Sequence, residues 1–184
     1  MVRAIAAKAI SAWGREAAAA MRVRDLVEAA FVQSREEIYV YLITLGLDTG
    51  AAQEVTQEAF LRLHIELEKG TRVRNPRAWT FRVAHNLAVT ARAEQRRTQD
   101  LDADIELTVA CGGADPERAL IDKERMRRLA QALNGLSSQQ RQCLHLRARG
   151  LRYQEIAETI GIASSTVGEF LQRGIARLRK ALHD

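Results

Sequence analysis

The chain has 184 residues, 47% of them apolar, and carries a formal net charge of +5 with a sequence pI of about 9.7. This length fits one domain or two small ones with a buried core, and the positive charge favours a polyanionic partner. The composition excludes a disulfide scaffold, since there are only two cysteines, and no apolar run approaches the length that spans a membrane.

The scarcity of proline and the many alanine, leucine, glutamate, arginine and glutamine residues predict an all-α protein. The two cysteines, Cys111 and Cys143, lie far apart, form no Cys-x-x-Cys metal motif, and fit a reducing cytoplasm. Neither a metal nor another cofactor is expected. We therefore anticipate two small helical domains joined by a flexible linker.

Residues 1–23 form an alanine-rich N-terminal extension. Lys8, Gly14 and Arg15 interrupt any apolar core, so a secretory signal peptide is not expected. The extension reads as a frayed helix or leader, with an additional helix docked on the body as the alternative.

The first domain is expected at residues 24–97. Apolar residues at helical spacing predict a helix from Arg24 to Gly46, with Leu26 on its buried side, and a second helix from Ala51 to Glu68. A polar loop follows and ends at Pro76, a residue that suits the first turn of a third helix running toward Arg97.

Periodicity fades over residues 98–114, where aspartate and glycine indicate a linker of acidic character. The second domain, residues 115–184, is expected to resume as helix at Glu117. Ser137 and Gln140 have the spacing of a capping box, which predicts a further helix ending at Gly150.

The stretch from Leu151 to Leu182 has the pattern of a helix-turn-helix. Gly161 can adopt the left-handed conformation that ends the first helix, and Ser164 can cap the second. The second helix would enter a DNA major groove. One face of this helix is expected to carry a buried apolar stripe, which comprises Val167, Leu171, Ile175 and Leu178.

Three segments together resemble the sigma-70 family, and specifically its small extracytoplasmic-function (ECF) members. Residues 136–144 with 150–162 resemble sigma region 4, residues 57–63 resemble the core of region 2, and residues 77–88 resemble its promoter-melting segment. The resemblance covers about residues 24 to 182. It implies a cytoplasmic bacterial protein without enzymatic activity that directs core RNA polymerase to promoters and starts transcription of a stress- or signal-responsive regulon.

By this resemblance, the loop at residues 70–75 and the third helix recognise and melt the −10 element. Arginines dominate this region, as contact with a phosphate backbone requires, and aromatic and polar side chains among them suit unpaired bases. For Trp79, burial in the core is the alternative. The candidates for −10 DNA are Arg72, Arg74, Asn75, Arg77, Trp79, Arg82, His85, Asn86 and Arg92.

The helix-turn-helix is expected to read the −35 element. Gly168, Glu169 and Phe170 depart from the basic or small polar residues usual in the family, and Glu169 can accept a hydrogen bond from cytosine N4. Phe170 can contact a thymine methyl or pack against a partner. The candidates for −35 DNA are Ser164, Ser165, Thr166, Glu169, Phe170, Gln172, Arg173 and Arg177.

The second helix is expected to bind the clamp helices of the polymerase β′ subunit, and the C-terminal domain the β flap. The candidates for the clamp helices are Glu54, Gln57, Glu58, Phe60 and Arg62. This segment has fewer acids than the family pattern, so phosphorylation of Thr56 by a Ser/Thr kinase is one hypothesis, with an ordinary helix residue as the alternative. An anti-sigma factor is a further possible partner.

Two other functions compete. A duplex-DNA regulator would need only the helix-turn-helix and would leave residues 77–88 without a purpose. An enzyme is disfavoured because the four histidines form no His-Glu-x-x-His motif and no phosphate-binding loop is present.

Overall fold

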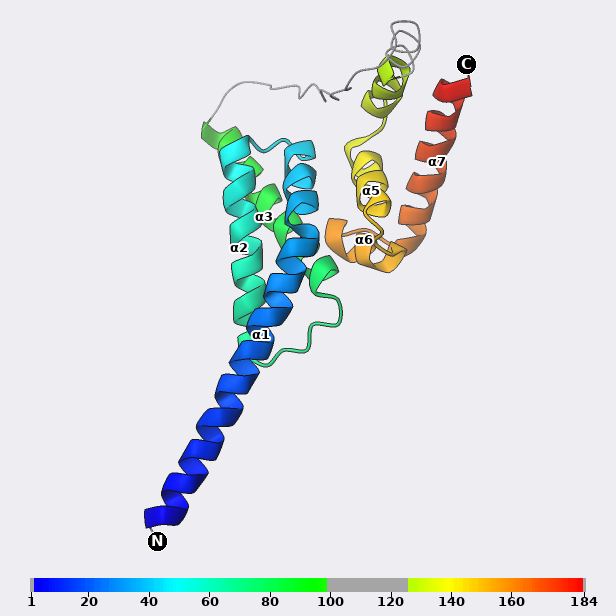
Figure 1. The fold of residues 1–184 in the computed structure, drawn as a ribbon. Helices are drawn as coiled ribbons and strands as arrows, with labels where there is room; N and C mark the ends of the chain where they lie inside the picture. Colours follow the sequence, from blue (N-terminus) through cyan, green and yellow to red (C-terminus); the bar gives the residue numbers. More distant parts are fainter. Residues whose placement is uncertain (1, 99–125, 184) are drawn as a thin grey trace, which may run out of the picture.

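The computed structural model describes residues 2–98 and 126–183, with side chains from 21 to 95 and from 126 to 182. All regular structure within these ranges is helical, which confirms the predicted all-α class. The N-terminal module contains α1, α2 and α3, and the C-terminal module contains a short helix at residues 126–134 followed by α5, α6 and α7 (Figure 1). The helices are α1 (Val2–Thr44), α2 (Thr49–Glu68), α3 (Pro76–Thr98), α5 (Ser138–Ala148), α6 (Tyr153–Ile160) and α7 (Ser164–His183).

The first helix is longer than predicted, because α1 begins at Val2 rather than near Arg24. The expected boundary between an extension and the first domain therefore does not fall at a helix end. The N-terminal half of α1 projects from the bundle as one continuous rod (Figure 1). The linker expected at residues 98–114 lies, apart from residue 98, outside the described residues, as does the helix start expected at Glu117.

The N-terminal module is a three-helix bundle with a buried, mainly apolar centre. Ile38, Tyr41 and Leu42 of α1, Leu63 of α2 and Phe81 of α3 are all fully buried. Burying side chains of this size stabilises a fold by roughly 1.5 to 3 kcal/mol each. Buried residues recur every three or four positions along each helix, as Ala52, Thr56, Ala59 and Leu63 do on α2, and this spacing is why the three helices pack together.

Capping residues fix the ends of α5 and α6 as predicted. Ser137 and Gln140 form the expected capping box, in which the Gln140 N–H donates to Ser137 Oγ at 3.2 Å and the Ser137 N–H donates to Gln140 Oε1 at 3.0 Å. Gly161 has φ 71° and ψ 38°, the left-handed conformation that a residue without a Cβ adopts most easily. The helix-turn-helix is thus present, with α6 as its first helix and α7 as its second.

Three local predictions were wrong. Ser164 is the first residue of α7 rather than its cap, so the capping position falls on Ala163, whose carbonyl accepts from the Val167 N–H. Leu26 and Ile175 were expected on buried faces but are 50% and 40% exposed. On α7 the buried stripe turns instead toward Gly174, because the missing side chain there lets Leu144 of α5 approach the helix closely.

The two modules pack against each other rather than standing apart. The start of α3 lies against α6 (Figure 1), and Tyr41 of α1 contacts the ring of His145 of α5, with 5.3 Å between ring centroids. One continuous set of buried residues runs through both modules. This packing brings the predicted −10 loop beside the helix-turn-helix.

Candidate nucleic-acid and polymerase interfaces

A pocket of about 390 Å³ lies at the junction of the loop before α3 and the first helix of the helix-turn-helix. This volume is within the range of sites that hold small ligands. Asn75 shapes the pocket wall because its Oδ1 accepts from the Ala78 N–H at 3.2 Å, which caps the first turn of α3. The lining residues are Thr71, Arg72, Val73, Arg74, Asn75, Ala78, Trp79, Arg82, Glu155 and Glu158.

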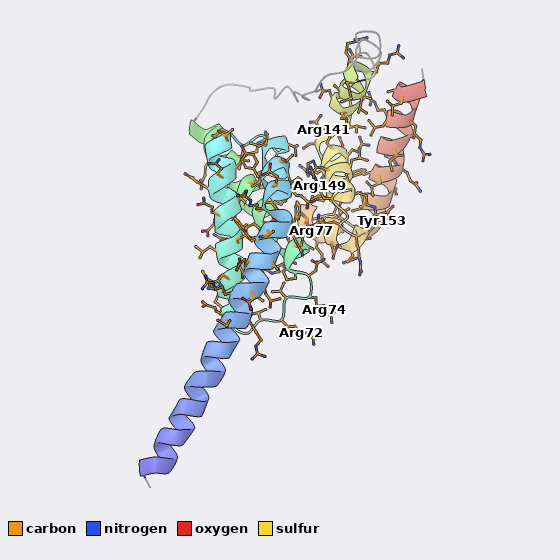
Figure 2. All side chains as sticks on the ribbon, in the orientation of Figure 1. Arg72, Arg74, Arg77, Arg141, Arg149 and Tyr153 are labelled. Carbon is orange, nitrogen blue, oxygen red and sulfur yellow. The ribbon has the colours of Figure 1, made fainter. Side chains whose placement is uncertain are left out.

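Five of the predicted −10 residues line this pocket. Arg72, Arg74 and Asn75 are exposed on the loop, and Figure 2 shows the two arginines reaching outward from it. Trp79 and Arg82 are half-buried on the first turns of α3. Both interpretations of Trp79, a core residue and a DNA-binding residue, are therefore partly compatible with the structure. Its side chain packs against the core and also lines the pocket.

Arg77 does not line the pocket, although it was grouped with the same residues. Its guanidinium pairs with the Glu37 carboxylate on α1 and donates to the backbone carbonyl of Arg149 at the end of α5. Figure 2 shows Arg77 and Arg149 close together at the junction between the modules. In this arrangement Arg77 joins the two modules rather than facing DNA.

His85 is also turned away from the surface. It is buried, its Nδ1 lies 2.8 Å from the Tyr41 hydroxyl, and burial lowers the pKa of its imidazole. The next residue, Asn86, is exposed, and Arg92 is half-buried further along α3. His85 lies four residues after Phe81 and three before Ala88, and so it shares the buried face of α3. It was placed on the DNA side because the family resemblance covers the whole segment.

The two acidic residues of the pocket come from the other module. Asn75 Nδ2 donates to Glu155 Oε1 at 2.6 Å, and Arg82 Nη1 lies 3.7 Å from Glu158 Oε2. Neither glutamate was predicted to belong to the −10 pocket. Their spacing of three residues puts both on one face of α6, but nothing in the sequence says that this face meets the loop before α3.

The predicted polymerase-binding face of α2 is partly occupied within the protein. Glu54 and Gln57 are exposed, and Glu58 forms an ion pair with Arg62 at 2.7 Å. Phe60 was placed on this face but is only 4% exposed, because its ring packs edge-on against Phe31 of α1 with 5.0 Å between centroids.

Thr56 faces the interior of the bundle. It is 7% exposed, and its hydroxyl donates to the Ala52 carbonyl at 2.7 Å. Of the two sequence interpretations, this geometry favours an ordinary packed helix residue. Phosphorylation of Thr56 would require α2 to separate from its neighbours.

The predicted −35 residues lie along α7 with different exposures. Ser165, Glu169, Gln172, Arg173 and Arg177 are exposed, whereas Ser164 and Thr166 are half-buried at the start of the helix. Glu169 and Arg173 form an ion pair one turn apart, with 3.1 Å between Oε2 and Nη2.

Two of the −35 candidates also have roles inside the C-terminal module. Phe170 is partly buried against the protein's own core, which is neither the contact with a thymine methyl nor the packing against a partner that was expected. Arg177 donates to the Gly135 carbonyl at 2.6 Å and so holds the C-terminal half of α7 against the turn before α5.

Tyr41 of α1 and His145 of α5 form an aromatic contact between the modules, and His85 lies beside Tyr41 within the N-terminal module. His145 Nε2 is buried and has no hydrogen-bond partner within the described residues. Burial, reinforced by the Arg149 charge, lowers the pKa of His145 to about 4 although Glu37 opposes the shift. Burial also raises the pKa of Tyr41, and it raises that of the nearby Cys143 thiol to about 11. All four groups are therefore neutral at pH 7, which suits an apolar contact.

Comparison with known proteins agrees with this division into two modules. Residues 31–98 match sigma-70 region 2, and residues 126–178 match sigma-70 region 4. The structure resembles that of the sigma factor RpoE in complex with the anti-sigma factor NepR from Bartonella quintana, with a TM-score of 0.61 and 21% identity over 85% of this chain and 96% of that one. It also resembles CnrH in complex with the cytosolic domain of CnrY, with a TM-score of 0.56 and 19% identity over 91% and 94%.

Two relatives have similar sequences along most of their length. The ECF RNA polymerase sigma factor SigK of Mycolicibacterium vanbaalenii is 27% identical over 171 residues, which are 89% of this chain and 85% of the relative. The ECF RNA polymerase sigma factor SigW of Bacillus subtilis is 26% identical over 159 residues, which are 82% and 85% of the two chains. With both sigma regions in order and relatives matched along most of their length, the chain belongs to the ECF sigma factors of the sigma-70 family, which recognise promoters and initiate transcription.

Proposed function

We propose that the two modules divide promoter recognition between them. The N-terminal module holds and opens the −10 element at the pocket before α3, and the C-terminal module reads the −35 element with α7. The observation that carries this proposal is the pocket itself, where exposed arginines surround a half-buried tryptophan and an asparagine. Cations attract the phosphate backbone, and an aromatic face with amide groups suits bases released from the duplex.

On α7 the ion pair between Glu169 and Arg173 is the proposed base-reading element. Both side chains are exposed and lie one turn apart, so they can address neighbouring base pairs in a major groove. Arginine pairs well with guanine O6 and N7, and a carboxylate accepts from cytosine N4. A −35 element with an essential G·C pair follows from this assignment.

Core RNA polymerase is the proposed partner through the exposed part of α2, where Glu54, Gln57 and the Glu58–Arg62 pair remain accessible. The β′ clamp helices would meet this face, and the β flap would meet the C-terminal module. The protein would act by binding rather than by covalent chemistry, and in the cytoplasm of a bacterium. Of the described residues, no helix is both long and apolar enough to cross a membrane.

An anti-sigma factor is the proposed regulator. Two structural relatives are described in complex with such a partner or with a cytosolic domain of another protein, and both share this fold. Control by an anti-sigma factor is favoured over control by a kinase. The Thr56 hydroxyl is buried and hydrogen-bonded, so a kinase could not reach it, whereas an anti-sigma factor could bind the accessible helix faces. A regulon responding to stress or another signal remains the expected target.

Mapping transcription start sites after overproduction in a bacterial host tests this proposal. The new start sites should share one motif near −10 and a second near −35. The variant Arg72→Ala/Arg74→Ala should lose most of these starts, whereas Arg24→Ala/Arg35→Ala, which removes two exposed cations from α1, should keep them. Start sites without a shared pair of motifs would contradict the proposal.

A further inference from the structure

The loop before α3 begins at a well-defined helix C-terminus. Gly70 has a φ of 80°, the left-handed conformation, and its N–H donates to the Leu67 carbonyl at 3.0 Å. The Thr71 N–H donates to the Glu66 carbonyl at 3.3 Å, and these two bonds make up the Schellman motif that ends many helices. The backbone of the loop therefore leaves α2 in one defined direction.

A side-chain hydrogen bond accompanies this backbone motif. In a Schellman motif an apolar contact frequently joins the two residues that here are Glu66 and Thr71. In this chain Thr71 Oγ1 instead donates to Glu66 Oε1 at 2.8 Å. The other carboxylate oxygen, Oε2, lies 3.7 Å from Lys69 Nζ, and the Glu66 side chain is 32% exposed. Glu66 therefore holds Thr71 through both its main chain and its side chain.

The rest of the loop is held at two further points. Val73 is half-buried and packs against the core, and Asn75 caps the first turn of α3 through its side-chain oxygen. Between these anchored residues, Arg72 and Arg74 are exposed and reach outward (Figure 2). Anchored and outward-facing residues thus alternate along the loop, so the position of each arginine depends on the anchors on either side of it.

We propose that Glu66 is a positioning residue for −10 recognition, which acts through Thr71 to hold Arg72 and Arg74 where they meet the DNA strand. This inference rests on the proposed function of the pocket and adds a residue that does not itself line it. A loop already in its binding conformation loses less conformational entropy when DNA binds, so removing an anchor weakens binding. Charge alone predicts the opposite sign, because a carboxylate repels phosphates and its removal would strengthen binding.

The test measures the binding of a fluorescein-labelled single strand by fluorescence anisotropy. The strand carries the −10 motif of the mapped start sites, and the protein is present as its complex with core RNA polymerase. Glu66→Ala should weaken binding about threefold, since one exposed hydrogen bond contributes modestly. Glu66→Gln keeps an oxygen that can accept from Thr71, so it should recover most of the lost affinity. A Glu66→Ala complex that binds as tightly as the original, or more tightly, would overturn the proposal.

A double-mutant cycle shows whether Glu66 acts through Thr71. Thr71→Val removes the hydroxyl but keeps a branched side chain of similar size, and it should also weaken binding about threefold. In Glu66→Ala/Thr71→Val the two losses should not add, so the double variant should bind about as well as either single variant. Losses that multiply would show that Thr71 contacts the strand directly and that Glu66 does not position it.

The matched control is Glu68→Ala, which removes the same charge from the same end of α2. Glu68 pairs with His64, 3.2 Å away, so this variant should bind within about twofold of the original. Thermal melting followed by circular dichroism verifies that each variant is folded. Binding of a duplex fragment that carries only the −35 motif should be the same for every variant. If Glu66→Ala weakens that binding as much as it weakens single-strand binding, the positioning role is wrong.

The variant Arg72→Ala/Arg74→Ala separates this inference from the proposed function. It should lose most of its binding to the single strand. If it binds as tightly as the original, the proposed −10 site is wrong and the positioning role is wrong with it. If it loses binding while Glu66→Ala does not, the −10 site stands and only the positioning role is wrong.

Discussion

Several residues that sequence analysis placed on functional surfaces are packed inside the bundle. Phe60, His85 and Thr56 each precede an exposed residue in the chain but face the core themselves. Adjacent positions on a helix differ by about 100° in direction, so a motif aligned by sequence includes both outward and inward side chains. Only the exposed residues of each motif therefore remain candidates for binding DNA or polymerase.

Replacing Thr56 by aspartate should destabilise the protein rather than activate it. The site is buried and the hydroxyl bonds only within its own helix, so a carboxylate there would lose hydration without gaining a cation. We expect the free energy of unfolding to fall by about 2 kcal/mol or more, with Thr56→Ala costing less. Urea denaturation measures both. A fully stable Thr56→Asp protein with increased transcription would instead support control by phosphorylation.

Glycine at two positions of α7 should respond differently to alanine. A Cβ at Gly168 would meet Tyr153 at 3.8 Å, an ordinary contact, whereas a Cβ at Gly174 would come within 2.9 Å of Leu144. Gly168→Ala should raise stability by roughly 0.5 to 1 kcal/mol through helix propensity, and Gly174→Ala should not. Thermal unfolding measures the stability of both variants. An equal increase in stability for both would show that the Leu144 side chain moves aside at little energetic cost.

The helices themselves follow closely from the sequence. Capping residues such as Ser137 and Gly161 act through local hydrogen bonds and backbone conformation, so their effect can be read without the fold. Faces are harder to predict, as Ile175 shows, because a neighbouring glycine let another helix approach from a different side. A frayed or additional helix was expected in residues 1–23, but its continuity with the first bundle helix was not predicted, because alanine-rich sequence has high helix propensity but no periodic signal.

The contact between α1, α3 and α5 should weaken as the solution becomes acidic. His145 has a pKa of about 4 when buried against Tyr41, compared with an ordinary value near 6.5 when exposed. Its neutral form is favoured in the packed arrangement, so the stability of the packing is complete above about pH 6.5 and is lost as the pH falls toward 4. Burial also lowers the pKa of His85, which lies beside Tyr41 inside the N-terminal bundle, so acid disfavours the burial of His85 there.

Other charged groups at this contact adjust the size of the effect. Arg149 of α5 disfavours protonated His145, and Glu37 of α1 favours it, while Arg77 of α3 partly neutralises Glu37. Tyr41 and Cys143 stay neutral throughout this range because burial raises their pKa values. Lowering the pH from 7 to 5.5 should therefore weaken the packing by about 1 kcal/mol.

Small-angle X-ray scattering across this pH range measures the separation of the modules, and the radius of gyration should increase on acidification. In His145→Gln, which cannot titrate, the increase should be smaller. An unchanged radius down to pH 4.5 would contradict the account.

For the whole molecule, the sequence was sufficient to predict two modules and to propose a separate role for each. It was not sufficient to predict how the two modules pack against each other. The loop arginines and the second helix of the helix-turn-helix belong to local motifs, so the roles proposed for them follow from short stretches of chain. The contacts of Asn75 with Glu155, and of Arg77 with Glu37 and Arg149, join residues about 40 to 80 positions apart. Such pairings depend on how two folded modules fit together, which local patterns do not encode.

Run-off transcription with purified protein and core RNA polymerase tests the central claim most directly. On a promoter taken from the mapped start sites, initiation should require the protein and polymerase together and should fall at least tenfold when either the −35 or the −10 element is replaced. A protein that bound duplex promoter DNA by itself but never directed initiation, or that initiated equally well without one of the two elements, would contradict the assignment of one promoter element to each module.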